Sequence, residues 1–382
     1  MPQQRNQRTI RILHIIEHSD FQLETYVADI AKNMQKFAIQ FDVVTFDHLN
    51  KAFQEAIQST GGDVYRIQSI KDNNLQAFAH SFQKVLDLYH YNVIHCHVTG
   101  YHATLYRLLS RKFNIPKFYV HAHEVNTYQG FIGMVQRIIQ QQLNRYVSDG
   151  YMGTSTEAIK SAYGYEIQKQ EMMRIPFSVD QSYIMWSEQE FLSLRRYYRE
   201  KYQLSNKDCV FGYVHPIHHT EDLSSVIRLA EYIQQKNFSD KIVILTNADA
   251  LDVLTERVES HQLSKIIKIF ESGQDYTKML PIFDAMMLFP NHRDAFKIAV
   301  ESQAAGIGVV TTNGLTNDAD LGINLMRRID SRHDVSHLYE FLTYFAHKQR
   351  LSQMTRQEAL QKHQYTQEEV ARLYQRFIRT RS

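Results

Sequence analysis

Four histidines stand in two pairs at the ends of two apolar runs of the sequence. His95 and His97 close the run NVIHCH, and His121 and His123 close the run KFYVHAH. Residues two apart in a strand point to the same face of a sheet, so each pair presents two imidazoles together. Imidazole changes charge near neutral pH and can serve as an acid, a base or a ligand. These two pairs are therefore the first candidates for a site.

A metal site and a structural role both compete with a catalytic role for these histidines. Neither a set of carboxylates nor a pair of cysteines joins them at the short spacing typical of zinc ligands, so we expect no metal. A buried histidine with satisfied hydrogen bonds stays open as an alternative. Glu124 follows His123 directly and is either an acid or base near a substrate or a surface carboxylate at the start of a loop.

The runs that carry the histidines belong to a longer alternation of strands and helices. Strands separated by helices of ordinary length predict right-handed βαβ units and a mainly parallel sheet. The pattern stops and then starts again in the second half of the chain. The expected strands are 10–16, 41–46, 64–67, 92–97, 117–123, 150–154 and 172–175, followed by 209–214, 241–246, 266–270, 285–289 and 309–312.

The length of the chain predicts two domains. A single core rarely grows beyond about 250–300 residues, and this chain has 382. The short connection around Pro176 and Phe177 suggests the border, which gives a first domain of residues 1–177 and a second of residues 178–365. Residues 366–382 form a final basic helix that we expect to cross back to the first domain.

Charge and hydropathy restrict the class of binding partner and the cellular compartment that we expect for the protein. The formal net charge of +2 does not favour nucleic acid as a partner. No stretch approaches the roughly 20 apolar residues needed to cross a bilayer, so we expect a cytoplasmic protein. Contact with the inner membrane face stays open, because the final helix carries Val370, Leu373, Tyr374 and Phe377 on one side. We favour a packing role for that side over a membrane surface.

Several segments, in register over nearly the whole chain, resemble bacterial glycosyltransferases of the family-4, GT-B type, especially those of exopolysaccharide and capsule synthesis. They are RILHIIEHSD, NVIHCHVTGYHATLYRLL, KFYVHAHEVNT, RIPFSVDQSYI and FDAMMLFPNHRDAFKIAVESQAAGIGVVTTN. The resemblance implies an α/β fold of two facing Rossmann-like domains, with the working site in the cleft between them. It also implies a hexosyltransferase that moves a sugar, with retention, from a nucleotide-diphosphate donor to a polysaccharide-repeat or lipid-linked acceptor. The nucleotide-sugar is a co-substrate, and no cofactor or metal is required.

The same resemblance assigns roles to particular residues. Glu301 is expected to begin a helix and to hold the ribose hydroxyls of the donor, while the helix N-terminus faces the diphosphate. A carboxylate that only completes a helix start is the alternative. His121 or His123 is expected near the transferred sugar.

The cations that usually neutralise the diphosphate are missing from their expected segment. Pro216 stands where the family has arginine, and Glu221 stands about where it has lysine. His218 and His219 are candidates for partial compensation, although neutral imidazole is a poor substitute for guanidinium. The loss of one such electrostatic contact costs several kcal/mol at a transition state, on the order of 3–4.

Further departures lie at other positions of the family's donor site. Arg293 replaces the glutamate eight residues before Glu301, and we expect it to restore one positive charge at the phosphates. Asn247 begins the segment that replaces Gly-Asp-Gly after the second strand, and the glycine-rich loop after the first strand is replaced by the segment HSDF. These changes keep a second interpretation open, a catalytically silent GT-B protein that binds a glycan or supports a partner glycosyltransferase. A nucleotide-sugar epimerase fits less well, because no separate acid–base set can be located.

Overall fold

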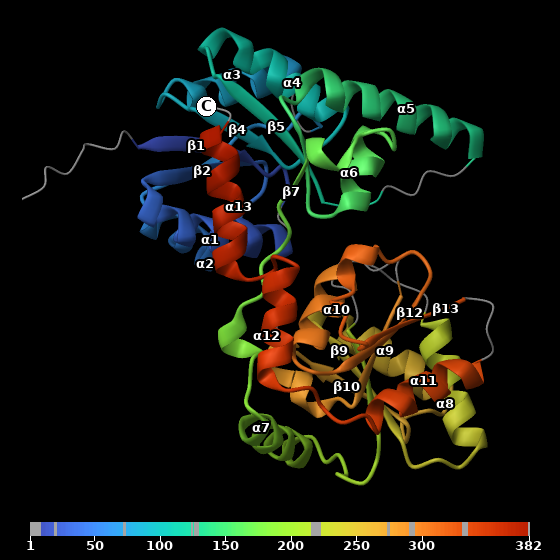
Figure 1. Cartoon of the computed structure of the whole chain (residues 1–382). Helices are drawn as coiled ribbons and strands as arrows, with labels where there is room; N and C mark the ends of the chain where they lie inside the picture. The colour runs from blue at the N-terminus through green and yellow to red at the C-terminus, as the bar shows by residue number, and fades with distance from the viewer. Residues whose placement is uncertain are drawn as a thin grey trace, which may run out of the picture. The chain divides into compact units, whose positions relative to one another are not determined.

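The computed structural model describes residues 9–18, 21–71, 74–123, 125, 130–214, 223–272, 276–289, 295–330 and 335–380 (Figure 1). The chain divides into two compact units. The N-terminal unit holds Met1–Ser178 together with Tyr365–Ser382, and the C-terminal unit holds Val179–Gln364. The last helix thus crosses back to the first unit.

The N-terminal unit is built on a seven-stranded parallel sheet with the order β3-β2-β1-β4-β5-β6-β7. Each strand overlaps one of the predicted runs, because a parallel strand covered on both faces is apolar along its whole length and is easily recognised. The strands are β1 (Ile10–Ile15), β2 (Ile39–Thr45), β3 (Val64–Arg66), β4 (Val93–Cys96), β5 (Lys117–Ala122), β6 (Tyr151–Gly153) and β7 (Met172–Arg174).

Helices cover both faces of this sheet. One core joins the sheet to α1 and α13, and the other core holds apolar residues of α3, α4 and α6. Asn50, Asn74 and Ser155 cap the starts of α2, α3 and α6 with their side chains, as polar N-cap residues commonly do. The helices are α1 (Phe21–Met34), α2 (Lys51–Ser59), α3 (Leu75–Leu86), α4 (Tyr101–Ser110), α5 (Gly130–Val147), α6 (Thr156–Tyr163) and α13 (Gln367–Thr380).

Helix α13 packs against α1 and the sheet (Figure 1). Its apolar residues Val370, Tyr374, Phe377 and Ile378 are buried, and the ring of Phe377 lies 4.2 Å from that of Tyr119. The alternative that this side of the helix lies on a membrane is therefore wrong. Its apolar stripe is part of the core.

The C-terminal unit repeats the architecture with a six-stranded parallel sheet of order β10-β9-β8-β11-β12-β13. The strands are β8 (Val210–Val214), β9 (Lys241–Thr246), β10 (Ile267–Glu271), β11 (Ala285–Leu288), β12 (Gly308–Thr312) and β13 (Met326–Ile329), and the helices are α7 (Glu188–Lys201), α8 (Ser224–Gln235), α9 (Ala248–Ser260), α10 (Ala295–Ala304), α11 (Val335–Ala346) and α12 (Gln353–Lys362). Strand β13, with the sequence MRRI, was not predicted, because its two arginines interrupt the apolar pattern. The two parallel α/β sheets confirm the predicted fold class. None of the helices in the described residues is both long and apolar enough to span a bilayer.

Candidate active site

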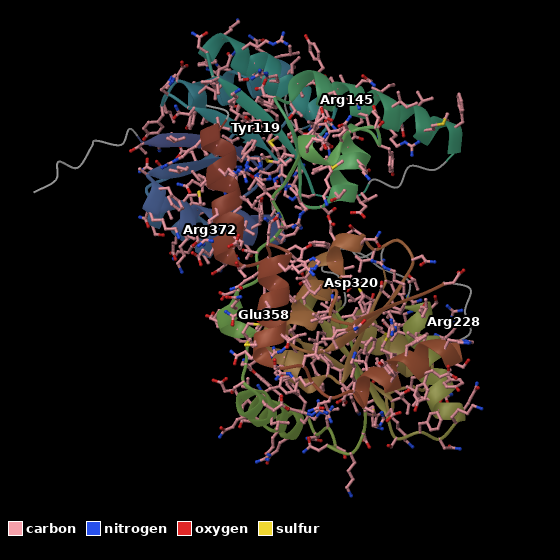
Figure 2. The ribbon with its side chains drawn as sticks, in the orientation of Figure 1. Tyr119, Arg145, Arg228, Asp320, Glu358 and Arg372 are labelled. Atoms are coloured by element: carbon pink, nitrogen blue, oxygen red, sulfur yellow. The ribbon has the colours of Figure 1, made fainter. Side chains whose placement is uncertain are left out.

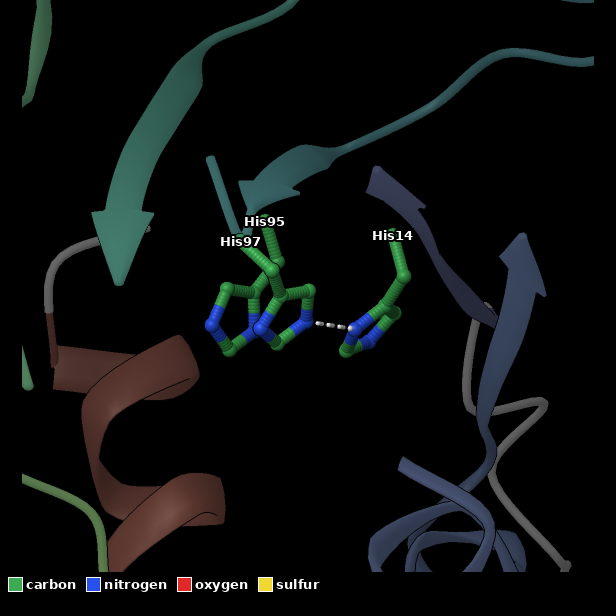
Figure 3. A group of neighbouring side chains, drawn as sticks. All are labelled: His14, His95 and His97. Atoms are coloured by element: carbon green, nitrogen blue, oxygen red, sulfur yellow. Dashed lines mark hydrogen bonds between the residues drawn. The ribbon is translucent and has the colours of Figure 1, made fainter. Parts of the chain in front are cut away.

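Five histidines, not four, gather on one face of the N-terminal sheet. In the register of β1 and β4, His14 lies opposite His95, and the face that carries His95 and His97 continues through Tyr119 and His121 on β5. Figure 3 shows His14 of β1 beside His95 of β4 and His97, which directly follows β4. His14 was not among the predicted site residues, although it occupies the same kind of position near the end of an apolar run.

Hydrogen bonds link the imidazoles directly to one another. Nδ1 of His14 lies 2.9 Å from Nε2 of His97, and Nδ1 of His97 lies 2.8 Å from Nε2 of His123. In a second branch, Nε2 of His95 lies 2.9 Å from Nδ1 of His121. The predicted pairs are therefore brought together, and each is bonded to the other strand's pair.

Tyr374 of α13 joins the two branches into one chain. Its hydroxyl lies 2.9 Å from Nδ1 of His95 and 3.3 Å from Nε2 of His14, so six groups form five links from His121 to His123. Neutral imidazoles carry one ring hydrogen each and the phenol carries one, so the six groups have six hydrogens for five links. The hydrogens either all point the same way along the chain or converge from both branches on the oxygen of Tyr374, because a hydroxyl oxygen can accept two hydrogen bonds.

Burial keeps these histidines neutral. Removal from water lowers the pKa of His14 to about 3, and it holds the pKa values of His95, His97 and His121 well below the ordinary value, with the neighbouring histidines adding to the effect. The backbone of Gly153 and Ile175 opposes the effect at His121.

Aromatic rings close the histidine cluster on the side of α1. The ring of Tyr26 meets the rings of His97, His121 and His123 edge-on, with centroids 5.6–6.2 Å apart. Its hydroxyl donates to the carbonyl of Ile175 at 3.4 Å. His123 is partly exposed, whereas the other four histidines are buried, so solvent reaches the cluster at His123.

A second titratable pair lies at the same end of β1. The imidazole of His102 on α4 is 2.7 Å from a carboxylate oxygen of the buried Glu17. The hydrogen bond to Glu17 raises the pKa of His102. This pair was not predicted either, because no spacing rule connects residues 85 positions apart.

Glu301 lies in the second turn of α10 rather than at its start, because the helix already begins at Ala295. The side chain is buried, with 3% exposure. The hydroxyl of Tyr276 donates to one carboxylate oxygen, and Nζ of Lys297 is 3.8 Å from the other. The expectation that Glu301 begins the helix is therefore wrong, and its carboxylate already has protein partners.

The position of α10 is fixed from both sides. Nε2 of Gln303 donates to the carbonyl of Ala319, and its Oε1 accepts from the amide of Leu321. The buried guanidinium of Arg356 donates to the carbonyl of Ala304 at 2.6 Å. Such bonds hold the helix, and with it Glu301, in one place.

Asn247 caps the start of α9. Its Oδ1 accepts a hydrogen bond from the amide of Ala250 at 3.3 Å. This is the ordinary role of asparagine at a helix start, and it occupies the side-chain oxygen. Glu124, Arg293, His218 and His219 lie outside the described residues, as do Pro216 and Glu221.

A small pocket of about 40 Å³ opens at the carboxyl ends of strands in the C-terminal unit. Among its lining residues, Phe289 follows β11, Thr312 is the last residue of β12, and Ile329 is the last residue of β13. Arg228 of α8, labelled in Figure 2, also lines the pocket. Ligands of doubly wound sheets bind at this end of the strands. The residues that line the pocket do not include Glu301.

Comparison with known proteins relates the chain to sugar-transferring enzymes. No family model matches it. EpsF of Bacillus subtilis (strain 168), which is named as a glycosyltransferase, is 19% identical over 334 residues, or 85% of each chain. A glycosyltransferase from Rickettsia africae superposes with a TM-score of 0.71, at 13% identity and over 98% of both chains. The chain has the GT-B glycosyltransferase fold.

The same GT-B fold is found in HepE (Alr3699) of Anabaena, whose crystal structure holds UDP and glucose. That structure superposes with a TM-score of 0.69, at 14% identity, over 97% of this chain and all of the other. The predicted resemblance to GT-B glycosyltransferases is therefore confirmed.

Proposed function

We propose that the protein is a retaining hexosyltransferase that takes its sugar from a nucleotide-diphosphate donor. The acceptor is a polysaccharide repeat or a lipid-linked sugar, and the transfer itself needs no metal or cofactor. The observation that carries the proposal is the buried carboxylate of Glu301, held on a fixed helix of a GT-B fold. The solved relative with UDP and glucose supports the class of donor.

The C-terminal unit binds the donor in this proposal, and the N-terminal unit binds the acceptor. Glu301 receives the ribose hydroxyls after Tyr276 yields one carboxylate oxygen. His123, which is partly exposed, or His121 contacts the transferred sugar, with Glu124 beside them as an acid or base. The remaining donor contacts come from Arg293, His218, His219 and Asn247.

The test of this proposal is a calorimetric titration of the purified protein with UDP- and GDP-sugars. The proposal expects micromolar to millimolar binding of one donor and release of the nucleoside diphosphate when an acceptor is added. Absence of any binding at millimolar donor supports the second candidate, a silent partner of another glycosyltransferase. Pro216 and Glu221, which replace the usual cations, are the observation that favours this candidate. Formation of an epimerised nucleotide-sugar without transfer to an acceptor would support a third candidate, a nucleotide-sugar epimerase.

We also propose that the protein contacts the inner membrane face through α5. This helix exposes most of the apolar residues of its first part and buries the polar side chain of Asn144. The amide of Asn144 is buried and donates to the carbonyl of Ala162, and Gln141 donates to the carbonyl of Ser161. Phe131 and Ile132, by contrast, are 76% and 73% exposed. The exposed apolar surface of α5, defined here as Phe131, Ile132, Met134, Val135, Ile138 and Ile139, lies along its first part.

The charge on α5 suits an anionic lipid surface. Its sequence contains Arg137 and Arg145 and no acidic residue, although the charge of Arg145 is paired with that of Glu166. Arg145, labelled in Figure 2, is held by Glu166 and by the carbonyl of Tyr163, which anchors the end of the helix to α6. A helix with an apolar face and basic residues binds at the headgroup boundary.

Replacement of Phe131 and Ile132 together by serine is expected to weaken binding to vesicles of anionic phospholipid by about 10–100-fold. Each large apolar side chain contributes about 1.5–3 kcal/mol when it leaves water completely, and less at an interface. Co-sedimentation with vesicles measures the change. The melting temperature is expected to stay the same, because both side chains are exposed.

The matched control replaces Val253 and Met354, two exposed apolar residues of the C-terminal unit, by serine. This variant should bind vesicles like the wild type. Equal loss in both variants, or no loss in the α5 variant, would remove α5 as the contact. A dimer that dissociates in the α5 variant would instead assign the surface to a second copy of the chain.

A further inference from the structure

His97, His121 and His123 hold ring nitrogens close enough to bind one ion. One ring nitrogen of each histidine lies within 4.8 Å of those of the other two. His97 directly follows β4, His121 belongs to β5, and His123 directly follows β5. Their ring centroids are 4.3–5.6 Å apart. We propose that these three histidines bind a divalent transition-metal ion such as Zn²⁺. The site lies apart from the donor contacts of the C-terminal unit, but it includes His121 and His123, the two candidates for contact with the transferred sugar.

The ligand type selects the class of ion. Neutral imidazole nitrogen suits Zn²⁺, Co²⁺, Ni²⁺ and Cu²⁺, whereas Mg²⁺ and Ca²⁺ prefer oxygen. Three protein nitrogens leave a fourth position of a tetrahedral ion for water or an anion. This proposal departs from the expectation of no metal drawn from the sequence, where neither carboxylates nor a cysteine pair join the four histidines at ligand spacing.

The structure gives two of the three ligands, His121 and His97, a hydrogen-bond partner for the ring nitrogen that does not face the ion. A histidine that binds a metal almost always donates its other ring N–H to a neighbouring acceptor. Here His95 lies 2.9 Å from Nδ1 of His121, and His14 lies 2.9 Å from Nε2 of His97. The nitrogens that remain are Nε2 of His121, which makes no hydrogen bond of ordinary length to the described residues, and Nδ1 of His97. Ligation through these two keeps both supporting bonds.

Tyr374 completes the support for both branches. Its oxygen has two lone pairs and lies 2.9 Å from Nδ1 of His95 and 3.3 Å from Nε2 of His14. With a metal bound, the ring hydrogens of both branches point away from the ion and end on this oxygen. The phenol hydrogen then has no acceptor within the network, a cost that metal binding must exceed.

The ion enters between His97 and His123. Their nitrogens are 2.8 Å apart, a hydrogen-bond distance, whereas two ligands at about 2.0–2.1 Å from a tetrahedral zinc are roughly 3.3 Å apart. The two rings must therefore separate by about half an ångström on binding. His123 is the partly exposed member of the triad and gives the ion a path from solvent. The ring of Tyr26 excludes bulk water from the other side.

Titration of the chelator-treated full chain with Co²⁺ and Zn²⁺ tests the proposal. The expected result is one ion per chain, with the intense visible absorption of four-coordinate Co²⁺ that Zn²⁺ then displaces. His123→Asn is expected to weaken binding by about 100-fold or more without loss of folding, because this ligand is partly exposed. Tyr374→Phe is expected to weaken binding by about 10–100-fold, as loss of an outer support does.

His102→Gln is the matched control, because His102 is a partly exposed histidine of the same unit that bonds to Glu17 and lies outside the triad. It should bind Co²⁺ like the wild type. Absence of saturable Co²⁺ and Zn²⁺ binding by the folded wild type would overturn the proposal, as would undiminished binding in His123→Asn. Either result would leave the five histidines as a hydrogen-bonded chain without a metal. The readout is metal binding, so a failure here is distinct from failure of the glycosyltransferase proposal.

Discussion

Acidification to about pH 5 is expected to unfold the N-terminal unit of the metal-free protein. His14 has a pKa of about 3 in the folded chain, and the pKa values of His95, His97 and His121 are also held well below the ordinary value by burial. The unfolded chain takes up a proton at each of these residues near pH 6.5, whereas the folded chain does not. Their full contribution to stability is therefore present above about pH 6.5 and is lost as the pH falls below it.

The size of the effect follows from the number of buried histidines. Each group lowers the free energy of unfolding by about 1.4 kcal/mol per pH unit, which gives about 2 kcal/mol at pH 5. His95, His97 and His121 add to this loss in the same direction, and a typical domain has a free energy of unfolding of only about 5–15 kcal/mol. The loss continues down to the folded pKa values, near 3 for His14.

Hydrogen exchange measured by mass spectrometry, in the presence of a chelator, follows the two units separately. Peptides from β4 and β5 are expected to lose protection between about pH 7 and pH 5, after correction for the intrinsic exchange rate. The single tryptophan, Trp186, lies in the C-terminal unit and gives an independent fluorescence signal there. Full protection of β4 at pH 5 would contradict the prediction.

Glu301→Gln is expected to reduce affinity for the nucleotide-sugar by about 10–150-fold. The amide keeps the volume of the side chain and one oxygen that can accept from Tyr276, but it removes the charge and one acceptor for the ribose hydroxyls. Hydrogen bonds to charged groups contribute about 1.5–3 kcal/mol each, which corresponds to this range. Calorimetric titration with the donor that binds the wild type measures the change.

Two further variants separate donor binding from a structural role of Glu301. Glu256→Gln changes an exposed glutamate of α9 and should leave affinity unchanged. Tyr276→Phe removes the hydroxyl that donates a hydrogen bond to the carboxylate of Glu301. This variant should therefore preserve or improve affinity for the nucleotide-sugar. If Glu301→Gln lowers the melting temperature while affinity stays the same, the carboxylate serves only the packing of α10.

Sequence pattern was sufficient for most of the framework. The run NVIHCH and its counterparts predict parallel strands because each is apolar enough to be covered on both faces. The strand β13 was not predicted, because Arg327 and Arg328 interrupt its apolar pattern, although its ends, Met326 and Ile329, are buried. No helix was predicted at α5 either, where the exposed apolar residues of the first part and the buried Asn144 depart from the usual pattern of a surface helix.

The sequence by itself determined the two parallel α/β sheets and the grouping of histidines at strand ends, because alternation along a strand is a local property. Tertiary structure decided what those histidines contact. The register of β1 against β4 places His14 beside His95. Tyr374 of α13, which bonds to His95, lies 279 positions after it in the sequence. The same holds for Glu301, since the start of α10 and the approach of Tyr276 depend on packing between segments distant in the chain. Such contacts leave no periodic signal, because they are set by how whole elements pack and not by the spacing of neighbours.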